Sequence, residues 1–145
     1  MILIEYGNDD NLTVSNYAKF YKLLLFLIFM MHKEDCLFCK IALKEIPVKI
    51  IYESDNFIAF PDANPKVDGH LLIISKNHYV NIMDMPATLG QELVDTIKKV
   101  AGIMLKQGAE GFNVIQNNFP AAGQIVMHAH IHLLPRKKGD GFKSM

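Results

Sequence analysis

The sequence lacks the features typical of secreted, nucleic-acid-binding or membrane-spanning proteins. Its 15 basic and 15 acidic residues cancel, so no excess of positive charge favours a nucleic-acid or anionic-membrane partner. Cys36 and Cys39 are its only cysteines, too few for a disulfide framework, and their two-residue separation is typical of a metal or redox pair. We therefore expect a reducing, cytoplasmic setting.

A hydrophobic run long enough to span a bilayer is also missing. The apolar run Leu23–Met31 has about half the necessary length for a helix. It matches the apolar part of a signal peptide in length, but acidic residues precede it and no small-residue cleavage site follows. We interpret residues 1–30 as a non-core extension or a wrongly assigned start, with an amphipathic membrane anchor as the alternative. Residues 31–145 are predicted to form a single domain, since their composition is globular and no repeat is present.

The apolar pattern predicts an α+β domain on an antiparallel sheet. A short helix is expected at 36–46 and a long one at 88–106, where Thr88 and Gln91 fit a capping box and Gly108 ends the helix. Strands are expected at 49–53, 56–60, 70–75, 111–116 and 127–136.

The segment 127–136 holds three of the six histidines at alternate positions. In a strand, this spacing puts His128, His130 and His132 on one face and apolar residues on the other, core-facing one. A half-buried strand could show this alternation for structural reasons alone, but it would not require imidazoles. The histidine row is therefore a candidate functional site.

Two chemistries use such a row. Alternate histidines can hold a catalytic zinc, or one neutral imidazole can attack as a nucleophile while its neighbours orient it or bind an anion. A hydrolytic metal site usually adds a carboxylate base, and none lies between Gly123 and Arg136. Asn117 and Gln124 are instead neutral donors suited to phosphate oxygens.

The sequence HAHIHLL from His128 resembles the defining motif of the histidine triad (HIT) family. Other matching segments follow the family's order: CLFCKIALKEIP, Ala59–Asp62, GHLLIISKNHY, Gly123-Gln124 and Pro135-Arg136. The resemblance covers residues 36–143 and is closest to the Hint-like branch of small nucleotide phosphoramidases and nucleotidyl hydrolases. It implies a HIT-like fold for the predicted domain, and a homodimer.

The resemblance also implies roles for individual residues. His130 matches the nucleophile, which attacks the α-phosphorus of a purine nucleotide (AMP or GMP type) carrying an amine or phosphate leaving group. Water then hydrolyses the nucleotidyl-histidine, and this chemistry needs no cofactor. His132 matches the residue that contacts the phosphate and helps the leaving group depart. The expected substrate-binding residues are Phe38, Ile41, Phe60 and Leu72 at the purine, Asp62 at the ribose, His70 near sugar and phosphate, and Asn117, Gly123 and Gln124 at the phosphate.

Several bacterial members of the family carry a structural zinc, and this chain matches all four ligand positions: Cys36, Cys39, His78 and His128. Two thiolates and two imidazoles suit tetrahedral Zn²⁺ at a closed site. We expect the ion to join the N-terminal helix to the triad segment. The alternatives are a redox pair, disfavoured without a thioredoxin-like βαβ unit, and a metal-free site with His128 simply hydrogen-bonded.

One departure from the family bears on the substrate. Ile125 occupies a position where many Hint-like proteins have a serine or threonine thought to protonate the leaving group. Since isoleucine cannot donate a proton, the preference for phosphoramidates over dinucleoside polyphosphates is open. Two rival functions also stay open: a nucleotide-binding regulatory module with vestigial catalysis, and a metallohydrolase with zinc on the triad.

Overall fold

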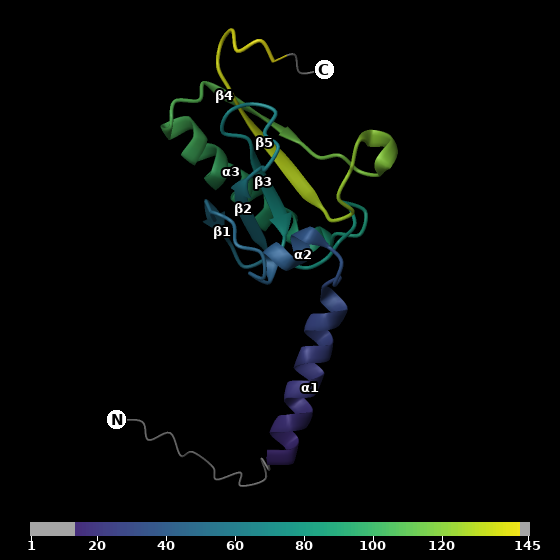
Figure 1. Ribbon diagram of the computed structural model, residues 1–145. Helices are drawn as coiled ribbons and strands as arrows, with labels where there is room; N and C mark the ends of the chain where they lie inside the picture. Colours follow the sequence, from purple (N-terminus) through teal and green to yellow (C-terminus); the bar gives the residue numbers. More distant parts are fainter. Residues whose placement is uncertain (1–13, 143–145) are drawn as a thin grey trace, which may run out of the picture. The chain divides into compact units, whose positions relative to one another are not determined.

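A computed structural model describes residues 14–142, and the chain divides into two compact units between His32 and Lys33 (Figure 1). In the first unit, the described residues form one helix, α1 (Val14–Met31), with exposed apolar side chains between Tyr17 and Leu27. Among the helices of residues 14–142, none is both long and apolar enough to cross a membrane. The interpretation of residues 1–30 stays a prediction, because residues 1–13 lie outside the described range.

The second unit is built on a five-stranded sheet in the order β1-β2-β3-β5-β4 (Figure 1). All neighbouring strands are antiparallel, which confirms the predicted α+β fold. The strands are β1 (Tyr52–Glu53), β2 (Phe57–Pro61), β3 (Leu71–Ser75), β4 (Gly111–Ile115) and β5 (His130–Arg136). The helices are α2 (Leu37–Ala42) and α3 (Gly90–Lys106), with short 3₁₀ turns at Ala87–Leu89 and Pro120–Ala122.

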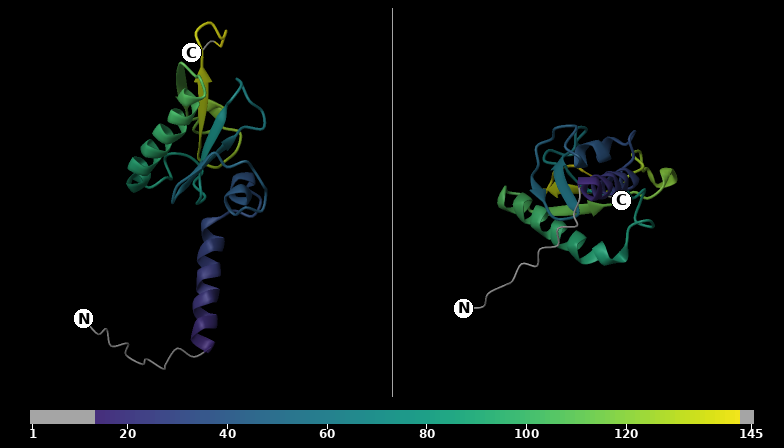
Figure 2. Two further views of the ribbon diagram at one scale, coloured as in Figure 1. Left: turned by 90° about the vertical axis from the view of Figure 1, so that its left-hand side faces the viewer. Right: turned by 90° about the horizontal axis from the view of Figure 1, so that it is seen from below.

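Both faces of the central strands β2 and β3 are buried. Figure 2 shows α3 and α2 on opposite sides of the sheet. Because side chains alternate along a strand, Phe57 and Ala59 of β2 join a cluster with α3, whereas Ile58 and Phe60 join a cluster with α2. Burial on both faces explains why β2 and β3 are continuously apolar in sequence.

Two details of the helices differ from the expectation. The long helix begins at Gly90, and its cap residue Leu89 makes no side-chain capping bond, so the capping box was wrong. Thr88 instead lies within the preceding 3₁₀ turn. The short helix ends at Ala42 because Lys44 has a left-handed backbone (φ 62°). The predicted end of the long helix is confirmed, since the Gly108 N–H donates to the Leu105 carbonyl with φ +95°.

Strand β4 forms one edge of the sheet, since it pairs with β5 along one side only. Its side chains Phe112 and Val114 are 39% and 46% exposed, although both are large and apolar. An exposed apolar edge strand offers unpaired backbone groups to a further strand.

Candidate functional site

The register of β5 directs two of the three histidines toward α2. His130 lies opposite Ile74 and His132 opposite Leu72 of β3, and both partners belong to the cluster with α2. The intervening Ile131 faces α3. The predicted alternation is therefore confirmed for His130 and His132.

The first histidine precedes this strand, which begins at His130, so the predicted strand was too long at this end. Its ring nevertheless lies on the α2 side as predicted, with its centroid 5.8 Å from that of Phe38. The backbone N–H of His128 donates to Val126, and the next N–H, of Ala129, donates to Tyr79. The carbonyl of Ala129 accepts from Ser75 at the end of β3, and regular pairing begins with β5 at His130. The ring of His128 is fully buried.

The backbone sets the protonation of His130. Its Nδ1 lies 2.7 Å from the carbonyl oxygen of His128, and a carbonyl can only accept a hydrogen bond. A neutral His130 ring therefore carries its proton on Nδ1 and has a free lone pair on Nε2. The ring is buried and touches Phe38 edge-on, with centroids 5.1 Å apart. This is the arrangement that a nucleophilic imidazole requires.

His132 lies in a second group with His70 and Asp62. Its Nδ1 is 3.0 Å from Nε2 of His70 and 3.9 Å from Oδ2 of Asp62. Burial lowers the pKa of His132 to about 4, with a smaller contribution from the neighbouring His130 and His70 and an opposing one from Asp62. His132 is consequently neutral at pH 7, when its single N–H can act as a hydrogen-bond donor.

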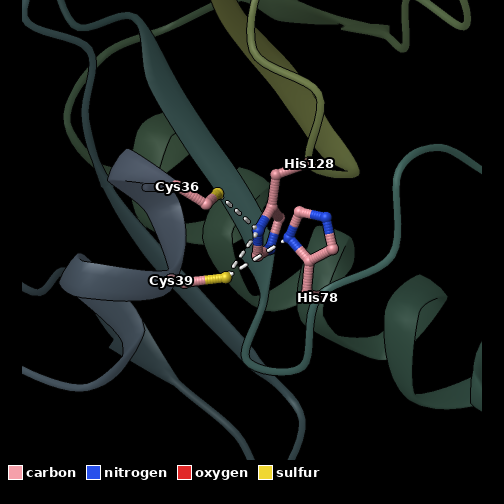
Figure 3. Close-up of side chains that lie close together, drawn as sticks. All are labelled: Cys36, Cys39, His78 and His128. Atoms are coloured by element: carbon pink, nitrogen blue, oxygen red, sulfur yellow. Dashed lines mark hydrogen bonds between the residues drawn. The ribbon is translucent and has the colours of Figure 1, made fainter. Parts of the chain in front are cut away.

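Four side chains converge at a candidate metal centre (Figure 3). Nδ1 of His128 lies 3.4 Å from Sγ of Cys36 and 3.6 Å from Sγ of Cys39, which is itself 3.3 Å from Nδ1 of His78. Bond lengths of 2.0–2.3 Å around a tetrahedral ion would separate its ligand atoms by about 3.3–3.8 Å. The donor set and its spacing therefore fit zinc.

The protonation of His128 also fits a metal ligand. Its Nε2 lies 2.8 Å from the carbonyl oxygen of Ser75, so the proton is on Nε2 and the lone pair of Nδ1 faces the two sulfurs. Burial raises the pKa of the Cys39 thiol to about 11, and a bound cation would favour the thiolate. The hydroxyl of Ser75 also lies 3.2 Å from Nε2 of His128. Sequence analysis gave Ser75 no role, because the shorter contact is made by a backbone carbonyl, which is the same for every residue type.

The residues expected at the phosphate lie in the loop between β4 and β5. The buried amide of Gln124 accepts from the Phe119 N–H at 2.8 Å and donates to the carbonyls of Val80 and Val126. Gly123 has φ +88°, and a Cβ there would lie 3.7 Å from the Asn117 amide nitrogen. The side chain of Gln124 thus holds the loop in shape.

The four apolar residues expected at the purine are buried in the cluster with α2, where the rings of Phe38 and Phe60 meet edge-on. In the loop between β4 and β5, Ile125 is 91% exposed. A separate cleft of about 610 Å³ lies at the other end of β5, beside Lys66, Pro135 and Phe142, and none of the predicted site residues lines it.

A family model and several known proteins are similar to this chain. The model of the HIT domain family matches residues 43–139. A HIT-like protein of Methanocaldococcus jannaschii is 42% identical over 106 residues, 73% of this chain and 82% of that protein. An adenylylsulfatase of Arabidopsis thaliana is 38% identical over 109 residues, 74% of this chain and 55% of that protein. An adenosine 5'-monophosphoramidase of Candida albicans is 35% identical over 108 residues, 71% of each.

Two solved structures are also similar. A protein from Streptococcus mutans has a TM-score of 0.74 and 39% identity, and the match covers 81% of this chain and 75% of that one. A zinc-bound histidine triad family protein from Mycobacterium smegmatis has a TM-score of 0.71 and 33% identity, with 75% and 80% covered.

Proposed function

This chain belongs to the HIT family, and we propose that it hydrolyses purine nucleotide conjugates at the α-phosphate through a nucleotidyl-histidine intermediate. The observation that carries the proposal is the 2.7 Å contact between Nδ1 of His130 and the His128 carbonyl, which leaves the lone pair of Nε2 free to attack. The relatives named as adenylylsulfatase and adenosine monophosphoramidase support hydrolysis at such a phosphorus.

The reaction has two balanced steps. In the first, a bond forms between Nε2 of His130 and the phosphorus while the bond to the leaving group breaks. A sulfate or polyphosphate departs as an anion, whereas an amine takes a proton from solvent as it departs. In the second step water attacks the phosphorus, the electron pair of the N–P bond returns to the ring, and the water proton passes to solvent. Nucleoside monophosphate and neutral His130 result.

The neighbouring residues stabilise charge and hold the nucleotide. The N–H of neutral His132 donates to a phosphate oxygen, and the amide of Asn117 supplies a second donor. Asp62 accepts from the ribose hydroxyls, close to His70. Gly123 and Gln124 hold the loop between β4 and β5 in shape beside the phosphate, through their backbone and amide contacts. The buried set Phe38, Ile41, Phe60 and Leu72 packs behind or against the purine.

Cys36, Cys39, His78 and His128 would hold a structural zinc. The zinc-bound relative from Mycobacterium smegmatis supports this assignment. The ion would lock α2 to the chain just before β5 and would supply no chemistry to the reaction. A zinc on all three triad histidines is disfavoured, because Nδ1 of His128 faces the cysteines and Nδ1 of His130 faces a carbonyl.

Three observations support the assembly and the setting that we propose. A second copy could add its β4 to the exposed apolar edge of β4, which supports a homodimer. Two free thiols, Cys36 and Cys39, support a reducing cytoplasm. The balanced charge favours neither a nucleic-acid nor a membrane partner.

The test uses the full chain with His130→Ala and, as a matched histidine substitution outside the site, His32→Ala. We expect His130→Ala to lower kcat on adenosine 5'-phosphoramidate and on diadenosine polyphosphate at least about a thousandfold while AMP binding, measured by calorimetry, persists. Wild-type protein quenched during turnover should carry one covalent nucleotide. Full activity of His130→Ala would refute the nucleophile, and wild-type turnover at the buffer rate with micromolar AMP affinity would favour a regulatory module.

A further inference from the structure

We propose that His70 is a positioning residue that keeps the single proton of neutral His132 on Nε2, the nitrogen left for the substrate. The inference rests on the proposed function for its kinetic consequence. Its structural part rests on a chain of hydrogen bonds that begins at the backbone of Lys66 and ends at His132.

The first hydrogen bond of this chain determines which nitrogen of His70 carries the proton. The backbone N–H of Lys66 donates to Nδ1 of His70 at 3.2 Å, and a ring nitrogen that accepts carries no proton. His70 is buried, and burial lowers its pKa, so the ring is neutral at pH 7. A neutral ring with an unprotonated Nδ1 has its proton on Nε2.

The second hydrogen bond determines which nitrogen of His132 carries the proton. Nε2 of His70 lies 3.0 Å from Nδ1 of His132, so the N–H of His70 donates and Nδ1 of His132 accepts. The proton of His132 must then be on Nε2. Because a neutral imidazole has one N–H, the tautomer decides whether the substrate meets a donor or a lone pair.

Asp62 explains why His70 is needed to keep the proton of His132 on Nε2. Its Oδ2 lies 3.9 Å from Nδ1 of His132, and a carboxylate facing a ring nitrogen favours a proton on that nitrogen. With His70 absent, Asp62 would draw the proton of His132 to Nδ1 and remove the donor from the substrate side. Oδ2 is also 3.4 Å from Nδ1 of His70, but the hydrogen bond to that nitrogen comes from Lys66.

The same trio could be considered as a metal site, since two imidazoles and a carboxylate offer ligand atoms within 4.8 Å of one another. Binding through Nε2 of His70 would require its lone pair there and its proton on Nδ1. The Lys66 N–H points at Nδ1, which opposes that tautomer. The hydrogen bonds therefore favour a chain of fixed donors and acceptors over a bound ion.

The direct test is the tautomer of His132 in zinc-loaded, full-length protein labelled with ¹⁵N-histidine, read from long-range ¹⁵N–¹H correlation spectra. We expect the Nε2–H form in the wild type and a shift toward Nδ1–H in His70→Leu. His70→Gln should restore the wild-type form, because the glutamine amide nitrogen takes the place of Nε2 and can donate. His32→Leu, a histidine substitution outside the trio, should leave the His132 signals in place.

Kinetics should follow the tautomer. We expect His70→Leu to lower kcat roughly tenfold to a hundredfold with KM changed less than about threefold, and His70→Gln to stay within about threefold of wild type. A purely structural role would reduce activity in both variants without moving the tautomer. An unchanged His132 tautomer in His70→Leu overturns the inference, as does a second zinc equivalent that the wild type binds and His70→Leu loses.

The two proposals fail separately. If His130→Ala remains active while the His132 tautomer still follows residue 70, the nucleophile is wrong and the positioning role stands. If His130→Ala is inactive and His70→Leu keeps both the wild-type tautomer and kcat, the proposed reaction stands and the role of His70 is refuted.

Discussion

The buried neutral state of His132 should make the protein's stability depend on pH. The pKa of this side chain falls from 6.5 in the unfolded chain to about 4 in the fold, chiefly through burial, and the side chain is 21% exposed. A folded pKa below the unfolded one means that the unfolded state takes up the proton first as pH falls. The contribution of neutral His132 to the free energy of unfolding is therefore complete above pH 6.5 and is lost as pH falls from 6.5 to 4.

The size of the effect follows from the shift. At 1.36 kcal/mol per pKa unit, the whole loss is about 3 kcal/mol, and about 2 kcal/mol of it occurs by pH 5. Urea unfolding at pH 7.5 and pH 5.0 measures it when the wild type is compared with His132→Asn, both saturated with zinc. Any loss of metal ligation at pH 5 is common to both proteins and cancels in the difference.

We expect the wild type to lose about 2 kcal/mol more than His132→Asn between the two pH values. His70, whose pKa is also lowered by burial, is present in both proteins. Equal losses in the two proteins would show that His132 titrates near its ordinary value. The argument that burial holds His132 neutral well below its ordinary pKa would then be refuted.

Three further predictions address the metal, the assembly and the substrate. Metal analysis should return about one zinc per chain in the wild type and none in Cys36→Ser/Cys39→Ser, which should also unfold at lower urea. Val114→Lys should shift the sedimentation coefficient from dimer to monomer, because a charge on the β4 edge opposes pairing. Ile125→Thr should raise kcat on adenosine phosphoramidate about tenfold relative to diadenosine polyphosphate, because a hydroxyl can donate to a departing amine.

The predictions on the assembly and on the substrate each have a matched control. Phe119→Lys, an exposed apolar position away from β4, should leave the dimer intact, and Ile125→Val should leave the substrate ratio unchanged. A metal-free wild type, a Val114→Lys dimer, or an equal change on both substrates with Ile125→Thr would contradict the respective argument.

Side-chain patterns predicted the antiparallel sheet, because apolar alternation and apolar runs leave a direct trace in sequence. The strand from His130, with Ile131 and Leu133 facing the core, is an example. The off-strand position of His128 left no such trace, since carbonyls of Val126 and Tyr79 hold the chain there. The same is true of the carbonyl of Ser75 behind His128. Backbone groups are the same for every residue type, so a sequence does not reveal which ones will be used.

Hydrogen bonds to one nitrogen of each ring support the three roles that we propose for the triad. Nε2 of His128 donates to the Ser75 carbonyl, so that Nδ1 faces the cysteines, whereas Nδ1 of His130 donates to a carbonyl and Nε2 remains for the proposed attack. In His132 the partner is a side chain: Nδ1 contacts His70, and Nε2 remains for the proposed contact with the phosphate.

The carbonyl that holds His130 belongs to His128, the same residue whose ring faces Cys36 and Cys39. A metal on that ring would therefore fix the proposed nucleophile, His130, through one residue without touching the substrate. We expect removal of zinc by a chelator to lower kcat roughly tenfold to a hundredfold, and restored zinc to recover it, while His130→Ala stays inactive with its zinc in place. An unchanged kcat in folded, metal-free protein would break the link between the two sites.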